Sequence, residues 1–101
     1  MENRDNILTE DSASLVAEFF SAFSDMTRLR IISLLTSGEM NVKGISKKIG
    51  ISESACSHQL RNLRQLRLVK SRKIGRRVFY NLDDVHIIEI FQAGINHVHH
   101  E

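Results

Sequence analysis

The chain has 101 residues, of which 42% are hydrophobic, with one cysteine and a formal net charge of +2. This length corresponds to one small domain, whose core is marginal unless a partner adds buried surface. A lone cysteine excludes an internal disulfide framework, and the sequence has neither a membrane-spanning apolar run nor a signal-peptide pattern. We therefore expect a cytoplasmic protein without a membrane partner.

The charge is concentrated in one segment. Residues 41–80 contain eleven Lys and Arg against one acid, Glu53, whereas the rest of the chain contains three basic and eleven acidic residues. The two parts carry +10 and −8. A structured region of one sign is typical of proteins that bind a polyanion, whereas an ordinary solvated surface mixes both signs. Nucleic acid is the expected partner.

Two helices are expected in the first third of the chain. Residues 1–11 are polar and predict a flexible N-terminus ahead of a domain over residues 12–101. The segment from Ser12 to Phe23 has a wide apolar stripe, which predicts a packed helix with surface to spare for a dimer interface. Asp25 begins a second helix that ends near Thr36, before Ser37-Gly38.

The middle of the chain predicts a helix-turn-helix, with helices over Val42–Ile49 and Glu53–Arg67 joined by Gly50-Ile51-Ser52. In the second helix, Cys56, Leu60 and Leu63 form the inner line. Short hydroxyls and a histidine on the outer face are suited to base edges, and the arginines further along are suited to phosphates. The candidate DNA-binding residues of this helix are Ser54, Ser57, His58, Arg61 and Arg64.

The sequence period then changes to two, which predicts strands over Val69–Ile74 and Arg77–Leu82 around a tight Gly75-Arg76 turn. A basic hairpin after a helix-turn-helix is a winged helix, so the expected fold is mostly α with a small β-hairpin. We expect Lys73, Arg76 and Arg77 to contact phosphates or the minor groove, although charges on an edge strand also prevent mispairing.

A final helix is expected over residues 83–100 and carries two apolar lines. Ile88, Phe91, Ile95 and Val98 form one line, and Ile87, Ile90 and Gly94 form the other. A terminal helix needs only one apolar face to dock on its own domain. The second line therefore predicts a homodimer that forms through the N- and C-terminal helices.

The same helix carries candidate metal ligands at both ends. Asp84 and His86 lie near its start and His97 and His100 near its end, and eleven residues from His86 to His97 span about 16 Å. Ligands lie about 2 Å from a metal ion, so one helix cannot close a single site. Two antiparallel copies would bring both pairs together, with Asp84 in the irregular first turn. A solvated histidine tail and a simple aspartate cap are the alternative.

Four segments of the chain, from about Phe20 to Glu101, resemble the ArsR/SmtB family of metal-responsive repressors. They are SDMTRLRIISLL, ISESACSHQLRNL, KSRKIGRRVFYNL and DDVHIIEI…INHVHH. The D-x-H pair with H-x-x-H is similar to the zinc- and cobalt-sensing SmtB/CzrA-like branch. The resemblance implies a dimeric repressor that binds an inverted-repeat operator in the apo form. It also implies release by Zn(II), with Co(II) as surrogate and Ni(II) as a further candidate, at Asp84, His86, His97 and His100.

The chain departs from many relatives where Asn41 and Lys43 replace a Cys-x-Cys motif, so a thiolate site for arsenic, lead or cadmium is missing. His99 and Glu101 are ambiguous additions to the metal shell, and Cys56 is expected to be a buried thiol. The alternative function is a winged-helix regulator without metal response, or a thiol-responsive one acting through Cys56. An enzyme is not expected, because four ligands fill a tetrahedral shell and leave no place for a catalytic water.

Overall fold

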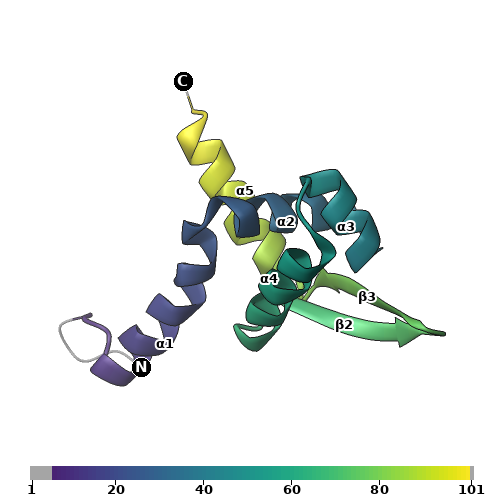
Figure 1. The fold of residues 1–101 in the computed structure, drawn as a ribbon. Helices are drawn as coiled ribbons and strands as arrows, with labels where there is room; N and C mark the ends of the chain where they lie inside the picture. Colours follow the sequence, from purple (N-terminus) through teal and green to yellow (C-terminus); the bar gives the residue numbers. More distant parts are fainter. Residues whose placement is uncertain (1–5, 101) are drawn as a thin grey trace.

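The computed structural model describes residues 6–100, and Figure 1 shows the arrangement of its helices and strands. A short polar side chain caps the N-terminus of each α-helix. The elements are α1 (Glu10–Ser21), the 3-10 turn η1 (Ala22–Ser24), α2 (Met26–Leu35), β1 (Met40–Asn41), α3 (Val42–Ile49), α4 (Glu53–Gln65), β2 (Val69–Ile74), β3 (Arg77–Leu82) and α5 (Val85–Val98). The caps are Thr9, Asp25, Asn41, Ser52 and Asp84. Each cap accepts a backbone N–H of the first turn, which is why the helices begin at these residues.

The expected helices and hairpin are present, with shifts at the ends. α1 begins at Glu10 rather than Ser12, because Thr9 accepts the backbone N–H of Ser12 at 3.2 Å. Part of the expected flexible terminus over residues 1–11 lies outside the described residues, and Glu101 also lies outside them. α4 ends at Gln65, and Arg67 follows with a φ of +62°, so that the backbone N–H of Leu68 donates to the carbonyl of Leu63.

The core lies where α2, α3, α4 and the sheet meet. Its fully buried side chains include Ile31, Ile32, Leu35, Ile45, Cys56, Leu60, Leu63 and Leu68. Half-buried Arg28 donates from Nε to Gln59 Oε1 at 3.1 Å, which ties α2 to α4. The helix-turn-helix is therefore fixed to α2 by apolar packing, by this bond, and by a long hydrogen bond of 3.5 Å from Arg30 Nη1 to the Ile49 carbonyl of α3.

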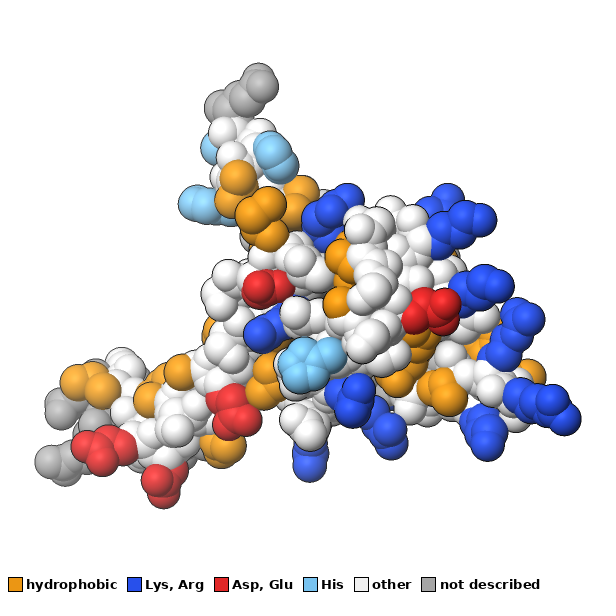
Figure 2. Space-filling model, viewed as in Figure 1, with side chains coloured by type: hydrophobic (Ala, Val, Ile, Leu, Met, Phe, Trp, Pro, Cys, Tyr) orange, Lys and Arg blue, Asp and Glu red, His pale blue; other side chains and the backbone are white. Residues whose placement is uncertain are grey.

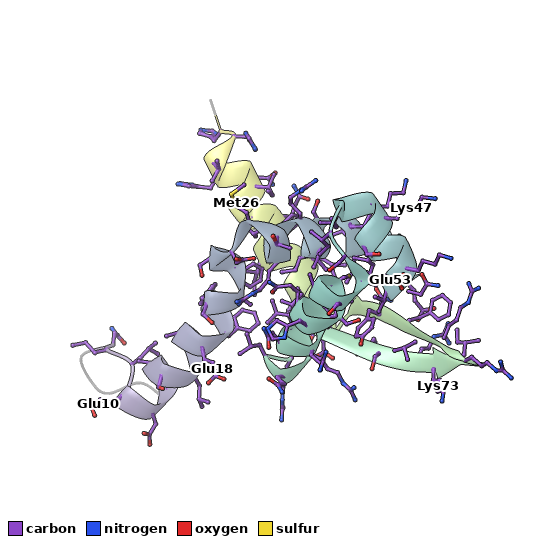
Figure 3. All side chains as sticks on the ribbon, in the orientation of Figure 1. Glu10, Glu18, Met26, Lys47, Glu53 and Lys73 are labelled. Atoms are coloured by element: carbon purple, nitrogen blue, oxygen red, sulfur yellow. The ribbon has the colours of Figure 1, made fainter. Side chains whose placement is uncertain are left out.

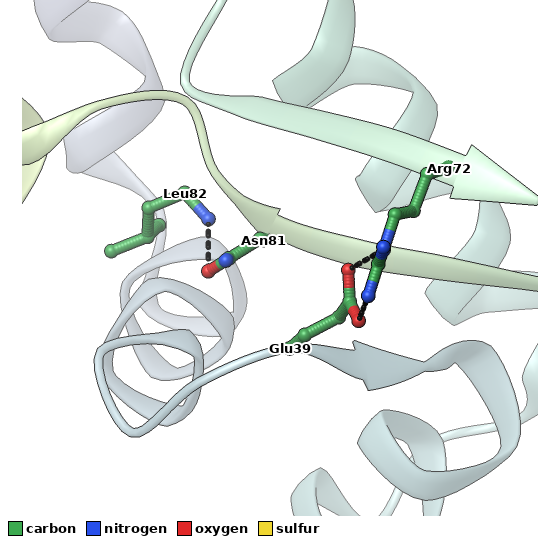
Figure 4. A network of polar contacts seen from close by, with 4 residues as sticks. All are labelled: Glu39, Arg72, Asn81 and Leu82. Atoms are coloured by element: carbon green, nitrogen blue, oxygen red, sulfur yellow. Dashed lines mark hydrogen bonds and ion pairs between the residues drawn. The ribbon is translucent and has the colours of Figure 1, made fainter.

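The sheet has three strands in the order β1-β3-β2, so a strand is present that the sequence pattern did not predict. β1 contains only Met40 and Asn41, which pair antiparallel with Tyr80 and Phe79. Glu39, just before β1, reaches across β3 to Arg72 on β2, as Figure 4 shows. The hairpin is thus held to the helical body along its base.

Helices α1 and α5 protrude from this body, on the side away from the β2–β3 hairpin (Figure 1). On α5, Ile87 is buried and Phe91 packs on the core, whereas Ile88, Ile95 and Val98 are exposed. On α1, Leu15, Val16 and Phe20 are exposed. One apolar face of each helix is therefore left uncovered in the single chain. Within residues 6–100, no helix has the length and apolarity to cross a membrane.

Candidate DNA-binding surface and metal centre

The turn between α3 and α4 directs α4 outward. Gly50 has a φ of +84°, a left-handed conformation that glycine adopts without strain, and its N–H donates to the Ser46 carbonyl at 2.8 Å. Ser52 then caps α4. Because Cys56, Leu60 and Leu63 are fully buried, the opposite face of α4 meets solvent.

The residues expected to contact DNA lie on this outer face and on the hairpin. Ser57 is half-buried, and the others are exposed: Ser54, His58, Arg61, Arg64, Lys73, Arg76 and Arg77. Gly75 has a φ of +62° at the turn between β2 and β3, so the basic tip of the hairpin is tight. Lys and Arg gather over the half of the molecule formed by α3, α4 and the hairpin (Figure 2).

Arg72 differs from the other basic residues of the hairpin. Its Nε lies 2.6 Å from Glu39 Oε2, and its Nη2 lies 2.8 Å from Glu39 Oε1. The hydrogen bond from Arg72 holds the pKa of Glu39 below its usual value, and the same bond raises the pKa of Arg72. Arg72 therefore binds the carboxylate of Glu39, whereas the exposed basic residues at the tip of the hairpin can contact other molecules.

Cys56 is fully buried on α4, with its Sγ 3.9 Å from the Val42 carbonyl oxygen. Burial, together with the charge of Glu53, raises the pKa of its thiol. A thiol held protonated and away from solvent is a weak nucleophile and a poor metal ligand. The expectation of a buried structural cysteine is confirmed.

The structure brings two of the four expected metal ligands together. Asp84 is the N-cap of α5, where its Oδ1 accepts the His86 backbone N–H at 2.8 Å and lies 3.2 Å from His86 Nδ1. Partial desolvation would raise the pKa of Asp84, but the bonds from His86 outweigh it and the pKa is lowered. The carboxylate therefore stays ionised beside the imidazole, and the side chains of both residues are exposed.

The other two expected ligands lie at the far end of α5. His97 is in its last turn, and His100 follows the C-cap, with its backbone N–H donating to the His97 carbonyl at 3.3 Å. Both side chains are exposed. Within residues 6–100, no group of three or more His, Cys, Asp or Glu side chains could hold a metal ion. A single chain thus offers two incomplete sets of ligands.

Two grooves border α5. One, of about 600 Å³, lies beside Asp84 and His86 and is also lined by Glu18 of α1 and by Arg67 after α4. The other, of about 460 Å³, is almost wholly apolar. Its lining residues are Phe20, Phe23, Leu29, Ile90, Phe91, Gly94, Ile95 and Val98. An apolar groove between two protruding helices is typical of a surface that a second subunit covers.

The sequence pattern did not indicate a function for two residues that lie on α4 or contact it. Glu53 is exposed at the first position of α4, on the otherwise basic face. Its isolation among the eleven basic residues of segment 41–80 is the sequence feature that could have marked it as a candidate for the DNA-binding surface. Arg28 holds α4 through Gln59, 31 positions away, and no local pattern indicates such a bond.

Helix α4 exposes a polar face, the β2–β3 hairpin beside it is basic, and α1 and α5 protrude with apolar faces. These features define a winged-helix DNA-binding regulator that works as a dimer, with α4 as its recognition helix. Residues 25–71 match the family described as bacterial regulatory protein, arsR family. The chain is 44% identical to the "Transcriptional repressor SmtB homolog" of Synechocystis sp., over 91% of this chain and 70% of the relative.

Two further similarities agree. The chain is 39% identical to the "Cadmium resistance transcriptional regulatory protein CadC homolog" of Staphylococcus aureus, over 81% of this chain and 69% of that one. A solution structure of a homodimeric winged helix-turn-helix DNA-binding domain from Mycobacterium bovis superposes with a TM-score of 0.81 at 26% identity. The match covers 93% of this chain and 94% of that one. The chain belongs to the arsR family of bacterial regulatory proteins. It is an ArsR/SmtB-type transcriptional repressor, the class of metal-responsive repressors, and not an enzyme.

Proposed function

We propose that this protein is a zinc-responsive repressor that binds operator DNA as an apo dimer and leaves it when Zn(II) binds between the subunits. The proposed ligands are Asp84 and His86 of one chain with His97 and His100 of the partner subunit. The observation that carries the proposal is the Asp84–His86 pair beside a groove at one end of α5, with two more exposed histidines at the other end.

The spacing of the first pair fits a zinc site. Two ligand atoms that are each about 2.0–2.1 Å from a tetrahedral zinc ion are about 3.3 Å apart. Asp84 Oδ1 and His86 Nδ1 are 3.2 Å apart. The cap bond to the His86 N–H leaves the carboxylate with further lone pairs, because its two oxygens offer about four acceptor positions. The helix cap itself therefore holds half of the ligand set near the required separation.

The second pair must come from another chain. His97 and His100 are three positions apart, so they lie on neighbouring parts of the same helical face. If the α5 helices of two subunits pack antiparallel, the end of one helix reaches the start of the other. The groove of about 600 Å³ beside Asp84 and His86 offers room there, and its acidic side chains favour a bound cation.

The ligand chemistry favours zinc or cobalt over a thiophilic metal. The proposed set contains only imidazole nitrogen and carboxylate oxygen, and the lone cysteine is buried on α4. Zinc accepts such ligands in tetrahedral sites, whereas soft metals prefer thiolates. Nickel would require a larger shell, for which His99 and Glu101 are the nearest additional donors. A DNA-binding repressor of this kind would work in the cytoplasm.

The DNA-binding part of the proposal places α4 in the major groove. Ser54, Ser57 and His58 lie in the first half of α4, from which base edges are contacted, and Arg61 and Arg64 lie further along. Lys73, Arg76 and Arg77 of the hairpin would contact the flanking backbone. A dimer then requires an inverted repeat whose half-site centres are about 34–36 Å apart, or a multiple of that distance.

Mixing of two defective chains tests whether the site is shared. One chain carries Asp84→Ala/His86→Ala and the other carries His97→Ala/His100→Ala, and neither homodimer should bind zinc tightly. In the heterodimer, one site collects all four substitutions and the other collects none. One tight site per heterodimer is expected by zinc titration. Absence of recovery in a heterodimer that forms normally would rule out sharing between subunits.

The alternative is a winged-helix repressor without metal response, in which Asp84 is only the helix cap and the histidines are solvated. The cap bond at 2.8 Å is the observation that favours it. Titration of zinc into the dimer bound to labelled operator DNA separates the two functions. The alternative predicts no release at zinc concentrations that saturate the protein.

A further inference from the structure

Glu53 is an isolated acid on the DNA-facing surface of the protein. It is the first residue of α4 and is exposed, and it is the only Asp or Glu among residues 41–80. Figure 3 shows it on the same side of the molecule as Lys47 and Lys73. A negative charge in this place opposes the binding of a polyanion.

Glu53 forms no ion pair with the described residues of the chain. It lines a groove of about 330 Å³ between α3, α4 and β3, together with Lys43 and Arg77. The ion pairs of the described residues join Arg72 to Glu39 and His86 to Asp84, and none of them involves Glu53. An unpaired carboxylate at this position repels phosphates and so weakens binding to DNA of every sequence.

A role in capping the helix does not account for this acid. Ser52 already caps α4 by accepting the Ala55 backbone N–H at 3.0 Å. In a capping box the returning carboxylate is the third residue of the helix, and here that residue is Ala55. The remaining local benefit is the favourable interaction of an acid with the N-terminal end of the helix dipole, which is small on an exposed surface.

We propose that Glu53 accepts a hydrogen bond from the N4 amino group of a cytosine and thereby determines one base pair of each half-site. Residues at the start of a recognition helix contact base edges in the major groove. An ionised carboxylate only accepts hydrogen bonds, so guanine O6 and N7 and thymine O4 cannot pair with it, and in adenine the N7 acceptor beside the N6 donor repels it. Cytosine N4 is the usual donor to a glutamate. This inference rests on the proposed placement of α4 in the major groove.

Glu53→Gln is the test, because it keeps the size of the side chain and removes the charge. Wild-type and variant dimers are each used to select from a library of random-sequence DNA duplexes at one salt concentration. Affinities are then measured on selected duplexes changed at single positions. The wild type should require cytosine at one position of each half-site, by roughly fivefold or more. The variant should lose that requirement and prefer adenine there, because a glutamine side chain pairs with adenine N6 and N7.

Glu10→Gln is the matched control. Glu10 is likewise an exposed first residue of a capped helix, but it lies on α1, away from α3, α4 and the hairpin. The substitution removes the same charge and should leave every base preference unchanged. Circular dichroism and the oligomeric state show whether each variant folds and dimerises as the wild type does.

The outcomes separate this inference from the function on which it rests. His58→Ala is selected in parallel as a second recognition-helix variant. A change of base preference with both His58→Ala and Glu53→Gln supports the proposal. A change with His58→Ala alone, while Glu53→Gln binds all duplexes more tightly by one common factor, overturns the role of Glu53 and leaves α4 in the major groove. No change with either variant overturns both.

Discussion

Arg72 and Glu39 form a two-pronged ion pair across the central strand of the sheet, with nitrogen–oxygen distances of 2.6 and 2.8 Å. The pair joins strand β2 to the residue before β1, 33 positions away in sequence (Figure 4). Because both prongs of the guanidinium bind the same carboxylate, its charge is matched locally. Arg72 thus differs from Arg76 at the tip of the hairpin, although both belong to the same basic segment.

This difference predicts unequal effects on DNA binding. Arg76→Ala should weaken binding to all sequences and flatten the slope of log affinity against log salt by about 1.8, because the dimer loses one phosphate contact per subunit and each contact on duplex DNA contributes about 0.9. Arg72→Ala should leave the slope unchanged. The measurement is operator affinity from about 50 to 200 mM salt. A flatter slope for Arg72→Ala would show that this arginine leaves Glu39 to contact phosphate.

The same pair predicts how stability depends on pH. The hydrogen bond from Arg72 lowers the pKa of Glu39 from its usual value of 4.5 in the folded protein. A carboxyl with a lowered folded pKa stabilises the protein above the unfolded pKa, and this contribution is lost as pH falls through the folded value. Glu39→Gln should therefore lose less stability than the wild type on acidification below about 4.5. Urea midpoints measured at one protein concentration test this, and parallel acid profiles would contradict it.

The sequence predicted those elements whose signals are local. Asn41 and Ser52 cap helices, and Gly50 and Gly75 adopt the left-handed conformations that end a helix and turn a hairpin, so these boundaries could be located from neighbouring residues. β1 escaped prediction because two residues have no period of their own and become a strand only by pairing with β3. The Glu39–Arg72 pair likewise depends on contacts distant in sequence.

The candidate metal site shows the same division. The two-residue distance between Asp84 and His86 predicted that Asp84 lies at the irregular start of α5. In the structure Asp84 is the N-cap of this helix. Which apolar residues of α5 dock on their own domain did not follow from the sequence. The two expected lines are mixed in the structure, since Ile87 of one line and Phe91 of the other face the core. Docking depends on parts of the core that are distant in sequence, such as β3, which α5 contacts, and the period of the helix carries no information about them.

The outer face of α4 predicts a division between specificity and affinity. His58→Ala and Ser57→Ala should relax the choice of sequence, because these short or polar side chains lie in the part of the helix that contacts base edges. Arg61→Ala should weaken binding to every duplex and reduce the salt slope. Competition of operator against mixed-sequence DNA measures both effects. Equal losses on specific and mixed DNA for His58→Ala would contradict the assignment of His58.

The burial of Cys56 predicts a metal site free of sulfur. Cobalt bound to the dimer should give a tetrahedral spectrum without a sulfur charge-transfer band, because the proposed ligands supply only nitrogen and oxygen. Cys56→Ser should leave that spectrum unchanged. Thiol-specific reagents should react slowly with the folded protein, since burial raises the pKa of the thiol. A sulfur band that disappears in Cys56→Ser would contradict the proposed ligand set.

The location of the proposed site determines how zinc could affect DNA binding. The proposed ligands lie at the ends of α5, whereas the basic surface lies on α3, α4 and the hairpin, so zinc cannot displace DNA by occupying its place. It must instead favour one arrangement of the two subunits over another. Joining α5 of each subunit to the other fixes the angle between protomers, and this angle sets the spacing of the two α4 helices. A small rotation then misplaces both helices relative to half-sites one turn apart.

A second contact would link the metal ligands to the recognition helix. A histidine that binds a metal usually donates its other ring N–H to a nearby acceptor. Arg67, just after α4, lines the groove beside Asp84 and His86, into which the proposal places His97 of the partner subunit. The resemblance to the SmtB/CzrA-like branch implies such a bond from His97 towards the end of α4, near Arg67. Zinc binding would then stiffen the connection between α5 and α4 in an arrangement that binds DNA weakly.

We therefore predict that zinc lowers operator affinity and that operator DNA weakens zinc binding by the same factor, because coupling between two sites is reciprocal. The coupling free energy should be at least about 1–3 kcal/mol, the typical range for allosteric pairs. His97→Asp keeps a metal-binding oxygen but lacks the second N–H, so it should retain some zinc binding and lose most of the coupling. His99→Ala, a neighbouring histidine outside the proposed ligand set, is the control and should keep both. Fluorescence anisotropy of labelled operator DNA, with and without saturating zinc, measures the coupling for each protein. Tighter operator binding with zinc, or no change with both sites filled, would mean that zinc is not the signal that releases this repressor.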